Sequence, residues 1–306
     1  MSDLPRRLAL DLELSEVEVC KSLADMPAAV ASAVGLDWRT LDSGIATAAS
    51  RADVLMYNRV VGLGVVAPAE PADLDAATEF FATAGAPRFM VNLAPTAAPP
   101  ELPQWLAARD FSFHNHWIKL WRPCDEPIAE PPDARVRPIG AEHAEAFARC
   151  DVEALALPEA IVPWLACTVG GKHWHHYAAF DVDEPVGFGA LRVMGRVGWL
   201  GMASTRLSHR RQGIQTALIA TRLRAAAGLG CEIVVVETAD DKLEKPNPST
   251  HNLVRMGFRA AYRRPNWVKK LALEMDPLRA AAAALAIEPE KAAAEALAIE
   301  TEKPAA

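Results

Sequence analysis

The order of strands and helices after residue 138 constrains the fold more than any other feature. Three strand-like segments are joined by turns of two residues, at 173–182, 185–194 and 197–205. Turns this short connect antiparallel neighbours. A basic turn, an amphipathic helix over 213–228 and a Val-rich strand at 232–238 follow. This order predicts an α+β fold, with helices packed on a sheet in mixed α/β layers.

Further segments extend this pattern in both directions. The sequence predicts helices at 15–34, 73–85, 101–111, 140–155, 158–169 and 249–258. It predicts further strands at 52–65, 88–93, 114–122, 259–263 and 266–273. Ser15 is the expected N-cap of the first helix, because its hydroxyl could accept a hydrogen bond from the first turn.

A proline-rich seam divides the chain. The stretch "RPCDEPIAEPPDARVRP" covers residues 122–138 and carries four prolines before Asp133, as a stiff connector would. With 306 residues, two domains are expected. The predicted division is a domain at 1–124, a linker at 125–133, a domain at 134–275 and an Ala/Glu-rich, low-complexity tail at 276–306. In that tail "ALAIEPEK" recurs as "ALAIETEK", and we expect it to be dispensable for catalysis.

Composition excludes several classes of protein. A net charge of −7 argues against nucleic acid as a partner, because a nucleic-acid site needs a basic face. The five cysteines are scattered without a C-x-x-C pair, which suits free thiols in a reducing cytoplasm and no metal site. Neither a signal peptide nor a membrane-spanning run is recognisable, so we expect a cytoplasmic protein with no membrane partner.

The turn "SHRRQGIQTALI", residues 208–219, has the chemistry of a pyrophosphate site. The first turn of a helix has unpaired N–H groups and the positive end of the helix dipole. Gly213 allows close approach of an anion, and Arg210 and Arg211 add positive charge. An ordinary basic helix start is the alternative. The P-loop and the G-x-G-x-x-G patterns are absent.

This turn resembles motif A of the GNAT superfamily of acyl-CoA N-acyltransferases, whose pattern is [QR]-x-x-G-x-[GA]. Arg210 and Gly213 match the pattern, while Gln215 replaces its small residue. Downstream, "PSTHNLVRMGF" is similar to the motif B helix of that family, which ends in a glycine-aromatic pair. The resemblance extends over residues 134–272 and implies a GNAT-like fold. The chain is similar to bacterial members that have two tandem halves. Its amino-terminal half is then a degenerate copy of the fold, and an unrelated α/β domain is the alternative.

The resemblance implies acetyl-CoA as cosubstrate and assigns its binding residues. The strand 202–205 would pair with the pantetheine arm, the turn 210–216 would hold the pyrophosphate, and two side chains of the motif B helix would face the cofactor. These cofactor-binding residues are Met202, Ala203, Ser204, Thr205, Arg210, Arg211, Gln212, Gly213, Ile214, Gln215, Thr216, Ser249 and Asn252. Many members have a tyrosine proton donor where this chain has Leu253. The amino-terminal half lacks a basic glycine turn, and we expect it to bind no cofactor.

Acyl transfer also needs a base for the amine and a donor for the oxyanion. Glu237, at the end of the valine strand, is one candidate base, since burial would raise its pKa. His175, in "HWHHY", is the other, either as base or as a residue lining the acceptor site. A structural ion pair for Glu237 and a polar strand face for His175 are the alternatives.

The leading hypothesis is an N-acetyltransferase acting on the primary amine of a small molecule. A pseudoenzyme or sensor that binds acyl-CoA, and a protein lysine acetyltransferase, are the alternatives. An open acidic groove would favour the lysine enzyme, and a closed pocket between the halves would favour a small acceptor. A homodimer is left open.

Overall fold

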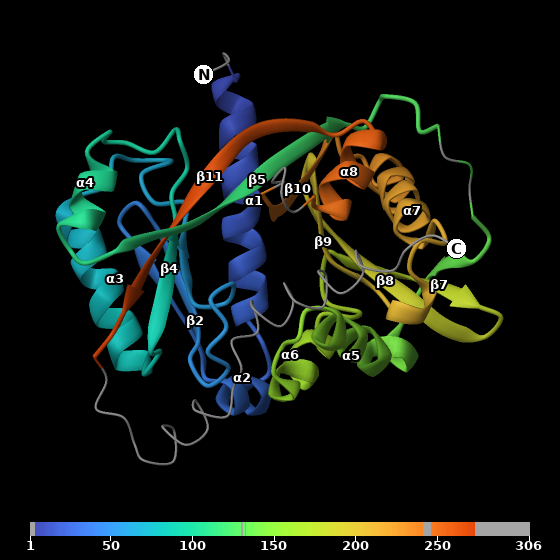
Figure 1. Ribbon diagram of the computed structural model, residues 1–306, viewed down its shortest axis with the longest axis horizontal. Coiled ribbons are helices and arrows are strands. Elements are labelled where there is room, and N and C mark those ends of the chain that lie inside the picture. Colours follow the sequence, from blue (N-terminus) through green and yellow to red (C-terminus); the bar gives the residue numbers. More distant parts are fainter. Residues whose placement is uncertain (1–3, 130, 132, 241–245, 273–306) are drawn as a thin grey trace, which may run out of the picture.

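Eleven strands form one mixed sheet across the part of the chain that is described (Figure 1). The computed structural model describes residues 4–129, 131, 133–240 and 246–272. The order of strands across the sheet is β1-β2-β3-β4-β11-β5-β10-β9-β8-β7-β6. The predicted tail lies outside the described residues. The predicted mixed α/β layers are confirmed.

The elements fall into two series. The first contains α1 (Arg6–Ala24), α2 (Ala28–Val34), β1 (Leu36–Leu41), β2 (Gly44–Ala49), β3 (Arg59–Val61), α3 (Pro71–Ala84), β4 (Arg88–Asn92), α4 (Leu102–Ala107) and β5 (Ser112–Pro123). The second contains β6 (Val136–Pro138), α5 (Ala144–Ala154), α6 (Val162–Ala166), β7 (Trp174–Asp181), β8 (Glu184–Met194), β9 (Val197–Thr205), α7 (Ile214–Gly228), β10 (Ile233–Ala239), α8 (Pro248–Arg255) and β11 (Arg259–Lys270). Short 3-10 turns lie at Ala141–His143, Glu159–Ile161 and Leu207–His209.

Apart from β6, the two series repeat one order of elements. Each runs helix, helix, three strands, helix, strand, helix, strand. In each, the third and fourth strands pair in parallel, β3 with β4 and β9 with β10. The amino-terminal half therefore repeats the architecture of the carboxyl-terminal half.

The two halves exchange their last strands. β5, from the first series, lies between β10 and β11, and Trp121 is paired with both Val235 and Arg259. β11, from the second series, lies between β5 and β4, where Trp267 pairs with Val91. Each half thus completes the sheet of the other. The seam at 125–133 connects two interlaced halves.

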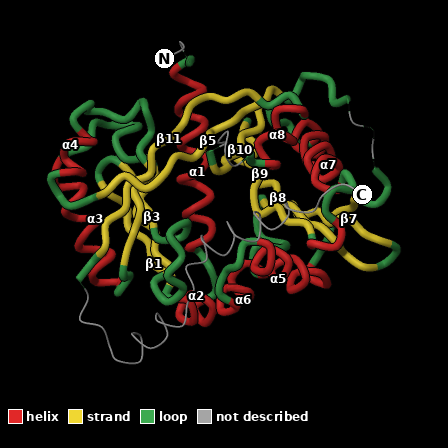
Figure 2. Tube along the Cα trace, in the orientation of Figure 1, coloured by secondary structure: helices red, strands yellow, loops and turns green. Residues whose placement is uncertain are grey.

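Helices cover both faces of the sheet. Alternation along β10 separates the faces, because Val235 packs in one cluster with Leu12 of α1, whereas Val234 packs with Leu218 of α7. Helices α1, α2, α5 and α6 lie on the first face, and α3, α4, α7 and α8 lie on the second. Helix α1 crosses the middle of the sheet, where the halves meet (Figure 2).

Several local predictions were wrong, among them the single helix over 15–34, which the structure divides into α1 and α2. Ser15 is not an N-cap, because α1 begins at Arg6 and an apolar stripe keeps the helix buried past that position; the Ser15 hydroxyl donates to the Leu12 carbonyl at 3.1 Å. The segment 52–65 contributes only the three-residue β3. Residues 259–270 form one strand, because Pro265 is accommodated beside β-bulges.

We expect residues 134–272 expressed alone to be unfolded, because their sheet would lose β5 between β10 and β11. Co-expression with residues 1–124 should restore a folded complex that elutes as one species. Circular dichroism and size-exclusion chromatography would measure both states. Cooperative thermal unfolding of the isolated 134–272 segment would contradict this expectation.

Candidate functional site

A gap opens between β9 and β10 on the carboxyl-terminal side of their pairing. The two strands pair in parallel from Ile233 with Val197 to Val236 with Leu200. Beyond that point β9 continues to pair with β8, and β10 continues to pair with β5. Among the described residues, the strand 201–205 therefore has no strand partner on this edge, so its backbone groups there could bind a ligand.

A β-bulge shapes this edge of β9. Ala190 pairs with Gly201 and Phe188 pairs with Ser204, so Gly189 alone faces both Met202 and Ala203. Met202 has a φ of +46°, in the left-handed region that a residue with a Cβ adopts at a cost of about 1 kcal/mol. The bulge redirects the backbone of the predicted pantetheine-binding strand at the opening of the gap.

The basic turn follows β9 and opens helix α7. Gly213 has a φ of +77° and occupies the N-cap position, with no side chain capping the helix and no acidic residue in its first turn. Arg211, also at positive φ, and Gln212 are exposed, and Arg210 donates to the Thr205 carbonyl at 3.5 Å. The start of α7 thus presents uncapped N–H groups beside two arginines, which suits an anion.

Gln215 connects α7 to the start of α8. Its amide nitrogen donates to the Ser249 hydroxyl at 3.3 Å, and its amide oxygen accepts from Asn252. Gln215 therefore binds the two α8 side chains predicted to face the cofactor. The residue that departs from the motif A pattern has a structural role between the helices.

The equivalent helix of the amino-terminal half begins with different chemistry. Helix α3 has Pro71 in its first turn, and Glu70 and Asp73 form a capping box there. The loop at Ala98 lies against the preceding glycine turn, with its N–H donating to the Gly64 carbonyl at 2.8 Å. Acidic side chains occupy the helix start that a phosphate would need, and the absence of a cofactor site in this half stays a prediction.

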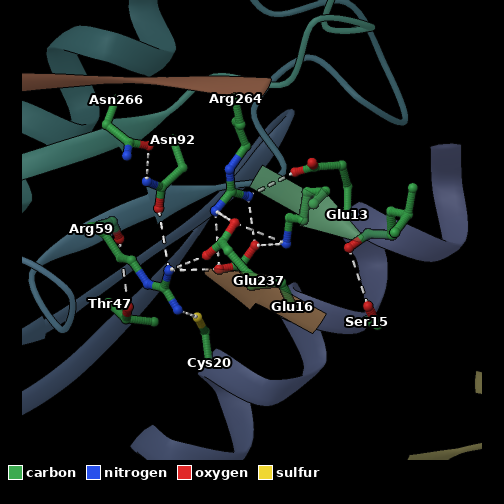
Figure 3. Close-up of polar contacts among 12 residues, drawn as sticks. Glu13, Ser15, Glu16, Cys20, Thr47, Arg59, Asn92, Glu237, Arg264 and Asn266 are labelled. Carbon is green, nitrogen blue, oxygen red and sulfur yellow. Dashed lines mark hydrogen bonds and ion pairs between the residues drawn. The ribbon is translucent and has the colours of Figure 1, made fainter. Parts of the chain in front are cut away.

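Glu237 lies within a buried group of six charged side chains, which we call the central ion cluster (Figure 3). Its members come from α1, β3, β5, β10 and β11, and they are Glu13, Glu16, Arg59, Lys119, Glu237 and Arg264. Lys119 Nζ lies 3.3 Å from a Glu237 carboxylate oxygen, Arg59 lies 3.8 Å from the other, and Arg264 is also ion-paired with Glu237. Burial raises the pKa of Glu237 above its usual value, and these cations, which lower it, offset that rise only in part.

Glu16 lies at the centre of this cluster. Arg59 Nη1 lies 2.6 Å from one Glu16 oxygen, Arg264 Nη1 lies 2.5 Å from the other, and Lys119 also donates to Glu16. Burial opposes the charge of this carboxylate, but Arg264, Lys119 and Arg59 together hold the pKa of Glu16 well below its usual range. Three carboxylates and three cations balance, so Glu237 is positioned as an ion-pair partner.

His175 lies away from the gap. It pairs across β7 and β8 with Leu191, which in turn pairs with Leu200 of β9, so it is two strands from β9. Leu191 and Leu200 pack in the cluster with α7, and His175 shares their face of the sheet. Burial, and then the neighbouring His173, lowers the pKa of His175. The structure does not bring His175 together with Glu237 or with the strand 202–205.

Residues 142–258 match the family model described as Acetyltransferase (GNAT) family. The chain carries a GNAT acetyltransferase domain. Proteins of this family transfer acyl groups, and they generally use acetyl-CoA as cosubstrate. No curated protein matches the chain significantly.

Solved structures share the fold of this chain at low identity. A GCN5-related N-acetyltransferase from Kribbella flavida is 18% identical with a TM-score of 0.56, over 80% of this chain and 96% of that one. A tandem GNAT protein from the clavulanic acid biosynthesis pathway is 15% identical with a TM-score of 0.52, over 77% and 82%. Both matches extend well beyond the GNAT domain, which agrees with the repeated architecture.

One feature of the GNAT domain, the isolated carboxyl group of Asp151, was not recognised in the sequence. Asp151 of α5 is 1% exposed, and its Oδ1 has no hydrogen-bond partner among the described residues. Burial raises the pKa of Asp151 to about 7. Leu253, expected where many members have a tyrosine, is buried at 3% exposure and packs with Leu218. No local pattern marks Asp151, because only packing isolates its carboxyl group.

No three His, Cys, Asp or Glu side chains gather into a group that could hold a metal ion, within the described ranges. Of the helices in the described part of the chain, none is both long and apolar enough to cross a membrane.

We expect Gly213→Asp to weaken acetyl-CoA binding, because a carboxylate would stand at the proposed pyrophosphate site. Gly213→Asn is the matched control, because asparagine must adopt the same positive φ as the aspartate and has nearly the same bulk, but carries no charge. Calorimetric titration should give one acetyl-CoA per wild-type chain, with Gly213→Asp binding at least about tenfold more weakly than Gly213→Asn, a difference of about 1.4 kcal/mol.

An aspartate at an N-cap stabilises a helix, so loss of α7 would not explain that result. Equal affinities of the Asp and Asn variants would contradict the proposed site.

Proposed function

We propose that the protein transfers the acetyl group of acetyl-CoA to the primary amine of a small molecule. The observation that carries this proposal is the gap between β9 and β10, which has the uncapped basic start of α7 nearby on one side of the sheet. On β10 the gap begins at Glu237, the first residue beyond the pairing with β9, and Glu237 contacts Arg59 of the amino-terminal half. Both halves therefore adjoin the place where the acyl group would be bound.

A cavity lined by Arg59, the same residue that contacts Glu237, is the candidate acceptor site. It contains about 280 Å³ of empty space, part of it open to solvent, and residues from both halves line it. Tyr57 and Arg59 come from the amino-terminal half, and Trp164 comes from α6. The rings of Tyr57 and Trp164 meet edge to face with centroids 4.6 Å apart. Aromatic walls with few polar groups are typical of small-molecule sites.

The chemistry requires three events on this chain. A backbone N–H of the strand 202–205 would stabilise the oxyanion that forms when the amine attacks the thioester carbonyl. The thiolate leaves without a side-chain acid at Leu253, which its pKa of about 8.5, like that of cysteine, allows. A base must first accept a proton from the ammonium form of the acceptor.

We infer that Asp151 accepts this proton and that Glu237 serves the central ion cluster. Asp151 has no ion-pair partner among the described residues, and its pKa of about 7 suits a base near neutral pH. Burial, and then the negative charge of Asp151, raises the pKa of Tyr57. Asp151 is therefore close to Tyr57, which lines the cavity. Glu237, by contrast, is surrounded by three cations.

Thiol release tests the reaction. Purified protein, acetyl-CoA and a panel of small primary amines should release coenzyme A, whereas lysine-containing peptides should not. Binding of acetyl-CoA without release in any mixture would favour the sensor alternative. Release with peptides alone would favour the protein lysine acetyltransferase.

A pair of isosteric variants tests the base. In the wild type, kcat/KM should fall as the pH drops below about 7, because Asp151 must be ionised to act. We expect Asp151→Asn to lower kcat/KM by about 100-fold or more and to flatten this acidic limb, with unchanged acetyl-CoA affinity.

Glu237→Gln should keep the acidic limb and lower the free energy of unfolding by about 3 kcal/mol, because it leaves buried cations unbalanced. If Glu237→Gln flattened the limb and Asp151→Asn did not, Glu237 would be the base.

A further inference from the structure

Arg222 of α7 is a buried cation with no role in the steps of the proposed reaction. The residue is 2% exposed, and no carboxylate lies within ion-pair distance of it among the described residues. Its Nε donates to the Leu218 carbonyl at 3.0 Å. Its Nη1 donates to the Ala190 carbonyl at 3.1 Å and to the Gly201 carbonyl at 3.4 Å. A buried charge with only carbonyl partners is costly, and burial lowers the pKa of Arg222 to about 10.

The two carbonyls on β8 and β9 mark one end of the β-bulge. Ala190 and Gly201 are the last regular pair before Gly189 faces Met202 and Ala203 together. Bulges interrupt the ladder of hydrogen bonds and leave backbone groups without strand partners. The Arg222 guanidinium replaces the missing donors, and one of the carbonyls it binds, that of Gly201, directly precedes Met202, whose φ is +46°.

β8 is shaped to admit this guanidinium. A Cβ on Gly189 would lie 2.7 Å from Arg222 Cζ and 2.9 Å from its Nε and Nη1, closer than real Cβ atoms come. A side chain at position 189 would therefore displace Arg222 from the bulge. The burial of Arg222 at the bulge therefore depends on the lack of a side chain at Gly189.

The Gly201 carbonyl and the Met202 N–H belong to the same peptide group. In a trans peptide these two groups point in opposite directions, so the Met202 N–H points away from Arg222. A cation that bonds to a carbonyl polarises the whole peptide and makes its N–H a stronger donor, most of all where the local dielectric is low. The donor that is strengthened lies on the strand proposed to stabilise the oxyanion.

We propose that Arg222 is a positioning residue for acyl transfer: it fixes the β9 bulge and polarises the Gly201–Met202 peptide, whose N–H binds the thioester oxygen. This inference rests on the proposed function, in which the strand 202–205 supplies the oxyanion donor. Arg222 itself touches neither acetyl-CoA nor the amine. Its effect increases as negative charge develops on the oxygen, so it acts mainly on kcat.

Arg222→Met, Arg222→Lys and the control Arg224→Met, on the same helix, test the proposal. We expect Arg222→Met to lower kcat by roughly tenfold or more, since the loss of a whole oxyanion donor costs about 100-fold. The dissociation constant of acetyl-CoA should change by less than about threefold. Arg222→Lys should recover part of kcat, and Arg224→Met should leave it unchanged. Unaltered kcat in a folded Arg222→Met protein, or equal losses in kcat and acetyl-CoA affinity, would overturn the proposal.

An infrared measurement tests the same inference without an acceptor. The thioester carbonyl stretch of bound acetyl-CoA should move to lower frequency in the wild type, relative to free acetyl-CoA, and should move less in Arg222→Met and to an intermediate degree in Arg222→Lys. Equal shifts in all three proteins would overturn the role of Arg222. A wild type that binds acetyl-CoA but releases no thiol would refute the proposed function, while this comparison would still decide the role of Arg222.

Discussion

The central ion cluster is the interaction on which the rest of the structure depends. Glu16 of α1 is 2% exposed and binds cations from β3, β5 and β11. Buried charges are tolerated only when they are paired and hydrogen-bonded, so the positions of these three strands under α1 are coupled. The cluster contains as many carboxylates as cations, and the loss of any one member would leave an unbalanced buried charge.

Strand exchange explains why such a cluster can exist. Lys119 of β5 lies directly opposite Glu237 of β10, and Arg264 of β11 lies on the same face. Asn92 of β4 extends the network by donating to Asn266 of β11 at 2.7 Å. Ions from one half are thus neutralised by ions from the other. The two halves form one hydrogen-bonded and electrostatic unit, and the gap between β9 and β10 opens beside it.

The buried arginines Arg264 and Arg222 have different kinds of partner. Arg264 in the cluster is surrounded by carboxylates, and burial lowers its pKa less than Glu16, Glu237 and Glu13 raise it. Arg222, under the bulge of β9, has only carbonyl partners among the described residues. The first arrangement cancels charge and stabilises the junction. The second leaves a positive charge next to the strand where a negative charge would develop.

The sequence by itself determined the carboxyl-terminal fold and the basic turn before α7. Short two-residue turns, a 3.6-residue apolar period and the glycine before α7 are local signals, so the strand order over 173–238 and the start of α7 could be predicted. Tertiary structure alone decided the rest. The exchange of β5 and β11, the ion pairs of Glu237, the distance of His175 from the gap and the isolation of Asp151 join residues that are far apart in the chain. Pairing partners and burial depend on such contacts, which no local pattern encodes.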